Sequence, residues 1–415
     1  MALVKPFKAI RPSVDKVHLV ASRSIDAYPT EELKNKLRAE PYSFLHIINP
    51  DHSDRIPTLP GSIERLQKVK NKFAEFITNK IFIKDTSPAF YIYRQIKENV
   101  TYTGIIGCAA VDDYYNGIIK KHEQTLTERE EKLKDYLDIC DFNAEPVLFC
   151  YPSDTIIDNI TDSVIQTAPL YDFVTNDAVK HRLWKIDNPA ILKEIENRFD
   201  KIRSIYIADG HHRSASSALL GKERKQNNPG HTGNEPYNFY LGIFFPETQL
   251  RIFDFNRVIA DTKGLSAEEL INKISDSFNV EEKKDLLYKP NCLHNFSMYL
   301  DKKWYSLTAK QEICTNNDPV EILDAQLLSK YILAPILNIT DLRTDKRIKF
   351  VPGIKGAEEL KNKVDSGKYK VAFGLFPVTM QQLKKVADAE KIMPPKSTWV
   401  EPKMRSGLTI YSLSE

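Results

Sequence analysis

The segment Ser204–Ala215, which reads SIYIADGHHRSA, constrains the fold more than any other part of the chain. Four apolar residues lead to a polar group of residues, and small residues at helical spacing follow, so the pattern predicts a strand, a loop and a helix. A helix N-terminus carries unpaired N–H groups and partial positive charge. A loop at this position that also contains Arg213 and two histidines is suited to bind an anion, and we interpret it as the active-site loop.

A simpler explanation of the same loop is structural. Asp209 would cap the helix, Gly210 would make the turn, and the histidines would lie on the surface. Capping alone requires neither histidine. A cluster of chemically versatile residues between a buried strand and a helix therefore favours the functional interpretation.

The composition indicates an ordinary globular protein. The length of 415 residues suggests two or three domains. The chain has 42% apolar residues, 28% charged residues and a net charge of +3. This balance gives no support for nucleic-acid binding. The first residues lack the apolar core of a signal peptide, and no apolar run is long enough to cross a bilayer, so we expect a cytoplasmic protein without a membrane partner. The five cysteines are scattered and indicate neither a zinc ribbon nor a disulfide framework.

The chain is expected to contain three domains. We predict an N-terminal mixed α/β domain over residues 1–150 and a core region over residues 151–260 that contains the Asp-Gly-His-His-Arg loop. A C-terminal α+β domain that ends in a binding tail is predicted over residues 261–415. The loop Asn227–Pro236 is long enough to act as a cover or to be mobile.

Periodicity predicts several elements in the N-terminal third of the chain. Val17–Ser24 and Tyr42–Ile48 are expected to be strands, the second because it alternates and contains aromatic and β-branched residues. A long amphipathic helix is predicted over Ser62–Asn79, and a hairpin is predicted around Lys97–Asn99.

Two further polar segments are candidate sites. Asp112 and Asp113 follow a predicted strand and can bind a divalent metal through water, while Lys120, His122 and Glu123 are suited to phosphate binding and proton transfer. A charged stretch before a helix is most often solvated surface, and that alternative stays open.

The second segment is the tail Met393–Leu408, where prolines, basic residues and hydroxyl groups are typical of a binding loop. A tail that Trp399 ties onto the body explains it equally well. No G-x-x-x-x-G-K-[ST] or G-x-G-x-x-G motif is present, which disfavours a standard phosphate loop or dinucleotide fold.

The chain resembles the bacterial and archaeal family DUF1015 over nearly its full length. The resemblance rests on Tyr42–Pro50, Tyr91–Gln95, Val111–Glu123, Ala144–Pro146, Tyr206–Arg213, Glu235–Phe239, Arg343–Arg347 and Met393–Leu408. The Asp-Gly-His-His-Arg block in turn resembles the Gly-x-x-Arg loop of the ParB/sulfiredoxin-like fold, where a nucleotide's phosphates lie at the loop and the following helix. Some members of that fold are kinases of free serine. The resemblance implies a mixed α/β chain with a ParB/sulfiredoxin-like nucleotide-binding core embedded in a larger, multi-layer structure.

Single positions of the loop refine this resemblance. Gly210 and Arg213 match the glycine and arginine of the fold, and His212 matches the histidine of its sulfiredoxin version. His211 stands where sulfiredoxins have their cysteine, and without that thiol their sulfinic-acid repair is disfavoured. No basic helix-turn-helix segment supports DNA binding of the ParB type.

The resemblance implies nucleotide-linked phosphoryl transfer to or from free serine, with ADP or ATP and Mg²⁺ as cofactors. Asp209 is expected to act as general base or magnesium ligand, His211 and Arg213 to hold the transferring phosphate, and His212 to position it or donate a proton. The nucleotide is expected to contact Gly210, Arg213, Ser214, Lys120, His122, Glu123, Lys396, Ser397 and Lys403.

Other functional classes remain open. A phosphatase or hydrolase would use the same loop with water as the acceptor, and a non-enzymatic regulator would bind nucleotide without turnover. A metal hydrolase built on His122, His181, His211 and His212 is disfavoured, because no H-x-x-x-H or H-x-H spacing supports it. A phosphotransferase acting on serine or phosphoserine is favoured, and a homodimer stays open.

Overall fold

The computed structural model describes residues 1–414, which form two compact units. The first unit contains residues 1–120 and 125–250 and the segment from Pro402 onward, and the second contains residues 121–124 and 251–401. This division differs from the three domains expected from the sequence. Residues on both sides of position 150 contribute strands to one sheet, so no domain boundary lies there.

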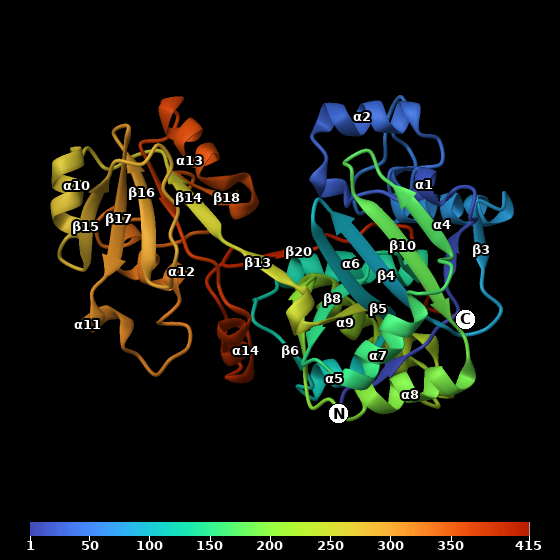
Figure 1. Cartoon of the computed structure of the whole chain (residues 1–415). Helices are drawn as coiled ribbons and strands as arrows, with labels where there is room; N and C mark the ends of the chain where they lie inside the picture. Colours follow the sequence, from blue (N-terminus) through green and yellow to red (C-terminus); the bar gives the residue numbers. More distant parts are fainter. Residues whose placement is uncertain (415) are drawn as a thin grey trace. The chain divides into compact units, whose positions relative to one another are not determined.

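A nine-stranded mixed sheet forms the centre of the first unit, in the order β6-β11-β8-β12-β5-β4-β10-β9, with β1 paired to β5 (Figure 1). The strands are β1 (Val4–Lys5), β4 (Phe90–Lys97), β5 (Val100–Ala110), β6 (Ile119–Lys120), β8 (Val147–Tyr151), β9 (Tyr171–Val174), β10 (Lys180–Ile186), β11 (Ile205–Asp209) and β12 (Phe239–Pro246). Strand β11 runs parallel to β6 and antiparallel to β8. The predicted hairpin is confirmed, since β4 and β5 pair with Lys97 opposite Val100.

Helices surround this sheet, and two short ribbons flank it. The helices are α1 (Val17–Val20), α2 (Thr30–Ala39), α3 (Leu45–Ile48), α4 (Ile63–Thr78), α5 (Val111–Tyr115), α6 (Thr127–Cys140), α7 (Thr155–Val164), α8 (Pro189–Phe199) and α9 (His211–Asn227). The ribbons pair β2 (Ile10–Pro12) with β3 (Phe82–Lys84) and β7 (Phe142–Asn143) with β21 (Tyr411–Ser412). Helices α7, α8 and α9 supply Ile157, Phe199 and Ala218 to the core around Phe149 and Phe244, and this packing holds α9 against the sheet.

Two of the predicted strands are wrong, and the long helix is confirmed. Val17–Val20 and Leu45–Ile48 are helical turns. In the second, Leu45, His46 and Ile47 are all buried, so burial is continuous and does not alternate as a half-exposed strand requires. Helix α4 begins where expected, because the Ser62 hydroxyl oxygen accepts a hydrogen bond from the Arg65 N–H at 3.2 Å.

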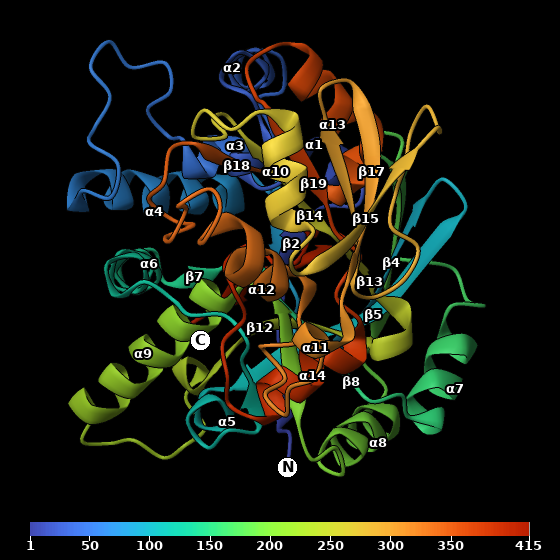
Figure 2. The same cartoon turned by 90° about the vertical axis from the view of Figure 1, so that its left-hand side faces the viewer.

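The second unit is an antiparallel sheet with helices on both faces (Figure 2). Its strand order is β15-β17-β16-β19-β14-β18. The elements are β13 (Arg251–Phe253), β14 (Phe255–Ile259), α10 (Ala267–Ile274), β15 (Phe278–Lys283), β16 (Asn295–Leu300), β17 (Lys303–Ala309), α11 (Gln311–Cys314), α12 (Asp324–Leu328), β18 (Ile348–Pro352), α13 (Gly356–Asp365), β19 (Val371–Gly374), α14 (Met380–Asp388) and β20 (Trp399–Glu401). Helices α10 and α12 pack with Ile259 and α13 packs with Val258, so neighbouring residues of β14 face different cores.

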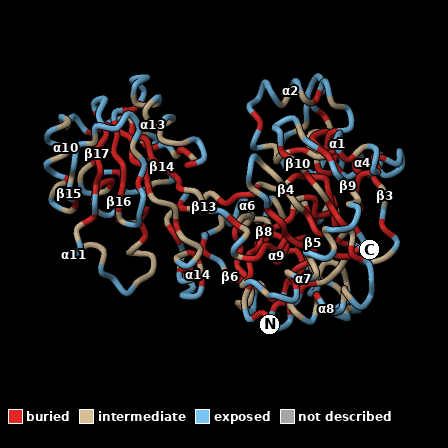
Figure 3. Tube along the Cα trace, in the orientation of Figure 1, coloured by how far each residue is buried: buried red, intermediate tan, exposed pale blue. Residues whose placement is uncertain are grey.

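In both units, the buried residues lie mainly on the strands of the central sheet. Figure 3 shows the buried residues concentrated along the strands, and the exposed residues along the outer sides of helices and on loops. Among residues 1–414, no helix combines the length and the apolar character that crossing a bilayer requires.

Candidate functional site

The predicted strand, loop and helix of the Asp-Gly-His-His-Arg segment are confirmed as β11, Gly210 and α9. The register of β11 against β8 shifts between Ile207 and Asp209, at the end of the strand. Gly210 has φ 98° and ψ 32°, a conformation that favours glycine, and it is the N-cap of α9. Asp209 therefore is not the N-cap residue, and the structural explanation of this acid does not hold.

Asp209 pairs with a residue from the C-terminal segment. The Lys403 ammonium donates a hydrogen bond to Asp209 Oδ2 at 2.9 Å, and the two side chains are 41% and 40% exposed. Burial alone would raise the pKa of Asp209, but the charges of Lys403 and Arg213 outweigh it and hold the pKa below its ordinary value. The carboxylate is therefore ionised at neutral pH, and its lowered pKa makes it a weak proton acceptor.

The Arg213 side chain folds back over the Gly210 turn. A Cβ atom on Gly210 would lie 3.0 Å from both Nε and Nη2 of Arg213, so a side chain at this position would require the guanidinium to shift. Arg213 Nη1 donates to the Pro146 carbonyl oxygen at 2.5 Å and lies 4.0 Å from Glu145 Oε2. These contacts hold a partly exposed positive charge beside the first turn of α9, where an anion would be stabilised.

The other residues of the loop differ in exposure. His211 is 4% exposed, whereas His212 is partly exposed. The Ser214 hydroxyl lies 2.8 Å from the Tyr240 hydroxyl, and Ser214 is fully buried. This contact directs the Ser214 side chain toward β12, so the geometry does not support the nucleotide contact predicted for it.

The remaining predicted residues are divided between the two units. Lys120 ends β6, beside β11, where it is paired with Tyr206. His122, Glu123, Lys396 and Ser397 belong to the second unit. There the Met393 N–H donates to the His122 carbonyl oxygen at 2.9 Å, and the Ser397 hydroxyl donates to the Pro394 carbonyl oxygen at 2.7 Å. Nucleotide contacts from these four residues stay predictions.

The neighbouring acids Asp112 and Asp113 differ in burial and have different partners. Asp113 is buried in α5, and its Oδ2 accepts a hydrogen bond from the Leu3 N–H at 2.6 Å. Asp112 is exposed and lies 3.4 Å from the Lys225 ammonium. Separate partners for the two carboxylates argue against a shared metal site.

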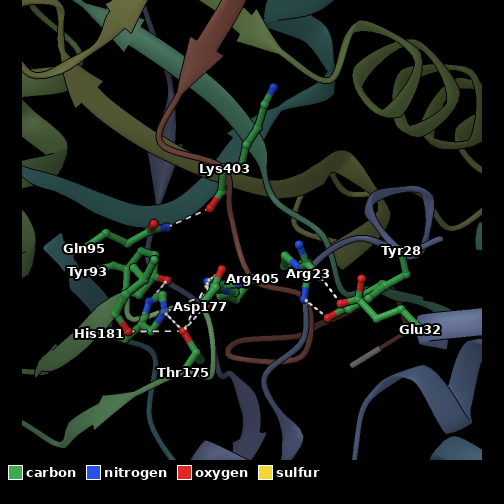
Figure 4. Close-up of polar contacts among 11 residues, drawn as sticks. Arg23, Tyr28, Glu32, Tyr93, Gln95, Thr175, Asp177, His181, Lys403 and Arg405 are labelled. Atoms are coloured by element: carbon green, nitrogen blue, oxygen red, sulfur yellow. Dashed lines mark hydrogen bonds and ion pairs between the residues drawn. The ribbon is translucent and has the colours of Figure 1, made fainter. Parts of the chain in front are cut away.

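Sequence reasoning missed several residues that surround Lys403 and Arg213. Gln95 Nε2 donates to the Lys403 carbonyl oxygen at 2.9 Å, and the Ser406 hydroxyl donates to Glu145 Oε1 at 2.8 Å. Figure 4 shows the Lys403 side chain pointing away from Gln95 and Arg405. The one signal in the sequence was that Gln95, Glu145 and the tail lie within blocks that carry the family resemblance.

Comparison with solved structures found distant likenesses. A free serine kinase in complex with AMP is 11% identical with a TM-score of 0.37, covering 75% of this chain and 91% of that chain. SbnI with a C-terminal truncation, from Staphylococcus aureus, is 12% identical with a TM-score of 0.41 and coverage of 74% and 87%. A conserved hypothetical protein from Pyrococcus furiosus is 13% identical with a TM-score of 0.35 and coverage of 74% and 94%.

Sequence comparison identifies the family. No protein with a curated description matches the chain at a significant level. The profile described as "Protein of unknown function (DUF1015)" matches residues 4–326, which is more than half of the chain. The chain therefore belongs to the DUF1015 family.

Proposed function

We propose that the protein transfers a phosphoryl group between a nucleotide and the hydroxyl of free serine. The observation that carries this proposal is the grouping of cations at the N-terminus of α9. Arg213 lies over the Gly210 turn, and Lys403 lies against Asp209. Helix N-termini and guanidinium groups bind phosphate, and phosphoryl transfer depends on positioning and charge neutralisation, without requiring a special nucleophile.

The groups around the turn have different roles in this proposal. The first N–H groups of α9 and the Arg213 guanidinium hold the transferring phosphate, and Lys403 supplies a second positive charge. His212, which is partly exposed, positions the phosphate or donates a proton. Free serine is chosen because the Asp209–Arg213 motif resembles the Gly-x-x-Arg loop of the ParB/sulfiredoxin-like fold, which includes kinases of free serine. The same groups serve either direction, because both directions share one transition state.

Magnesium fits the carboxylate at this turn. Proteins usually hold Mg²⁺ through one or two carboxylates together with substrate phosphates. Asp209 is ionised, partly exposed and next to the phosphate-binding turn, so it is the residue that would hold the ion. When bound, magnesium would neutralise charge on the phosphate oxygens.

The experiment is a phosphate-transfer assay followed by ³¹P NMR. The purified protein is incubated with phosphoserine, ADP and magnesium, and separately with serine, ATP and magnesium. We expect transfer between serine and nucleotide in at least one direction and its loss on addition of a chelator. Phosphate release from phosphoserine that needs no ADP would instead identify a hydrolase. Nucleotide binding that raises the melting temperature without any turnover would identify a regulator, and either outcome would overturn the proposal.

A further inference from the structure

Arg405 lies two residues after Lys403, and it is buried inside the first unit. Its Nη2 donates to Asp177 Oδ2 at 2.7 Å and to Thr175 Oγ1 at 3.2 Å, and its Nε donates to His181 Nε2 at 3.3 Å (Figure 4). Arg405 is 7% exposed. Because Nε and Nη2 are committed to these acceptors, the guanidinium ties the segment that carries it to residues 175–181.

The contact between Arg405 Nε and His181 Nε2 determines which nitrogen of the imidazole carries the proton. The imidazole is fully buried between the rings of Phe173 and Tyr93. Burial, reinforced by the charge of Arg405, lowers the pKa of His181 to about 3, so the ring is neutral under physiological conditions. An arginine N–H can only donate, so Nε2 is the acceptor nitrogen. Nδ1 therefore carries the proton and donates to the Tyr93 hydroxyl oxygen at 2.8 Å.

The backbone around Lys403 is held by other elements as well. Gln95, which is buried on β4, binds the Lys403 carbonyl oxygen. The Ser406 N–H donates to the Ser22 carbonyl oxygen at 2.8 Å, and the Ser22 N–H donates in return at 3.3 Å. The Lys403 side chain is long and flexible, so its ammonium reaches Asp209 only if the Lys403 backbone is held at the right position.

We infer that Arg405 is a positioning residue, which Asp177 and His181 clamp so that segment 403–406 presents the Lys403 ammonium to Asp209. The inference rests on the proposed function, because it concerns the same Lys403–Asp209 pair. Without the clamp, Gln95 and Ser406 still hold the segment, but the backbone between these two contacts is no longer fixed. The effect of Arg405 on the site therefore passes through Lys403.

The first test measures the segment itself and needs no activity. Hydrogen exchange followed by mass spectrometry is measured on the full chain for the wild type, Arg405→Ala and Arg405→Lys. We expect faster exchange in peptides covering residues 402–408 in Arg405→Ala, unchanged exchange in β11 and α9, and an intermediate result for Arg405→Lys, which keeps the charge but not the forked donor geometry. The matched control is Arg182→Ala, which removes an arginine next to His181 on β10 that pairs with Asp172. Unchanged exchange over residues 402–408 in both Arg405 variants would overturn the inference.

The second test is a double-mutant cycle on the transfer reaction. Arg405→Ala and Lys403→Ala are each expected to lower kcat by about 10- to 100-fold, since small misplacements in an active site have effects of this size. The double variant is expected to match the slower single variant within about twofold, because both changes remove the same contact. Multiplied losses would show that Arg405 acts independently of Lys403 and would overturn the inference. A wild type without turnover would contradict the proposed function, and the exchange measurement would still decide the positioning role.

Discussion

The Lys403 ammonium lies 2.9 Å from Asp209 Oδ2, although 194 residues separate the two in the chain. Asp209 ends the strand before the Gly210 turn, and Lys403 follows the point where the chain returns to the first unit. A partly exposed ion pair of this kind contributes little to stability. Its main consequence is electrostatic, because it keeps an ionised carboxylate and a cation together beside the N-terminus of α9.

Replacing Lys403 with methionine, which is unbranched and one atom shorter and carries no charge, is expected to raise the pKa of Asp209. Lys403 makes the largest charge contribution that lowers this pKa, and the opposing effect of burial remains in the variant. The measurement is a pH titration of the side-chain carboxyl carbon by NMR, with Asp209→Asn used to assign the signal. An unchanged titration would contradict the ion pair.

Asp209→Ala and Arg213→Ala are each expected to abolish phosphate transfer and to leave the fold intact. Both side chains are partly exposed, with Asp209 at 40% and Arg213 at 29%, so each truncation should change the free energy of unfolding by no more than about 1 kcal/mol. Steady-state kinetics and urea unfolding test the two parts separately. Arg182→Ala, at a similarly exposed arginine paired with Asp172, should keep full activity. Full activity in Asp209→Ala would contradict the site.

Gly210→Ala is expected to lower both stability and anion binding. The positive φ of 98° disfavours any side chain by about 1–2 kcal/mol, and the new methyl group would also push against the Arg213 guanidinium. Gly117→Ala is the matched control, because Gly117 also has a positive φ of 69° but has no atom within 4 Å of the added carbon. Both variants should have a lower melting temperature than the wild type. Calorimetry with ADP should show weaker binding only for Gly210→Ala. Equal binding in the two variants would argue against the turn as the phosphate site.

Asp113→Asn is expected to stabilise the protein at neutral pH. Burial, partly opposed by the hydrogen bond from the Leu3 N–H, raises the pKa of Asp113 to about 6. The folded state therefore holds this proton more tightly than the unfolded state, and this contribution to stability is present below the ordinary pKa and lost as the pH rises through about 6. Asparagine keeps an acceptor for Leu3 without a charge. The variant should gain at most about 3 kcal/mol over the wild type at pH 8 and nothing near pH 4. A gain that does not depend on pH, measured by unfolding at both values, would show that Asp113 is not the titrating group.

Local sequence patterns predicted those elements that are determined by residues close together in the chain. The β4–β5 hairpin, helix α4 with its Ser62 cap, and the strand, turn and helix at Asp209–Arg213 all depend on neighbours in sequence. Tyr42–Ile48 was predicted wrongly because its aromatic and β-branched residues are typical of strands, whereas its tertiary surroundings bury successive residues. Propensity is a weak guide where packing on all sides decides the backbone.

The candidate site could be predicted only in part, for a related reason. The composition of the Gly210 turn indicated an anion site, but whether Asp209 was a cap, a base or a metal ligand depended on a partner that no spacing identifies. Gln95, Glu145 and Arg405 hold the segment that carries Lys403, through hydrogen bonds between residues far apart in the chain. Such contacts follow from the sheet order, which local periodicity does not specify.

The sequence by itself determined the chemistry of the turn: an acid, a glycine that permits a positive φ, and a cation at the start of a helix. It also determined membership of the DUF1015 family. Only the tertiary structure decided that Lys403 pairs with Asp209, that Arg405 is buried against His181, and that Ser214 faces the core. Residue types and short spacings determine what a segment can do, whereas the charges that set the state of Asp209 come from segments that only the folded sheet brings together.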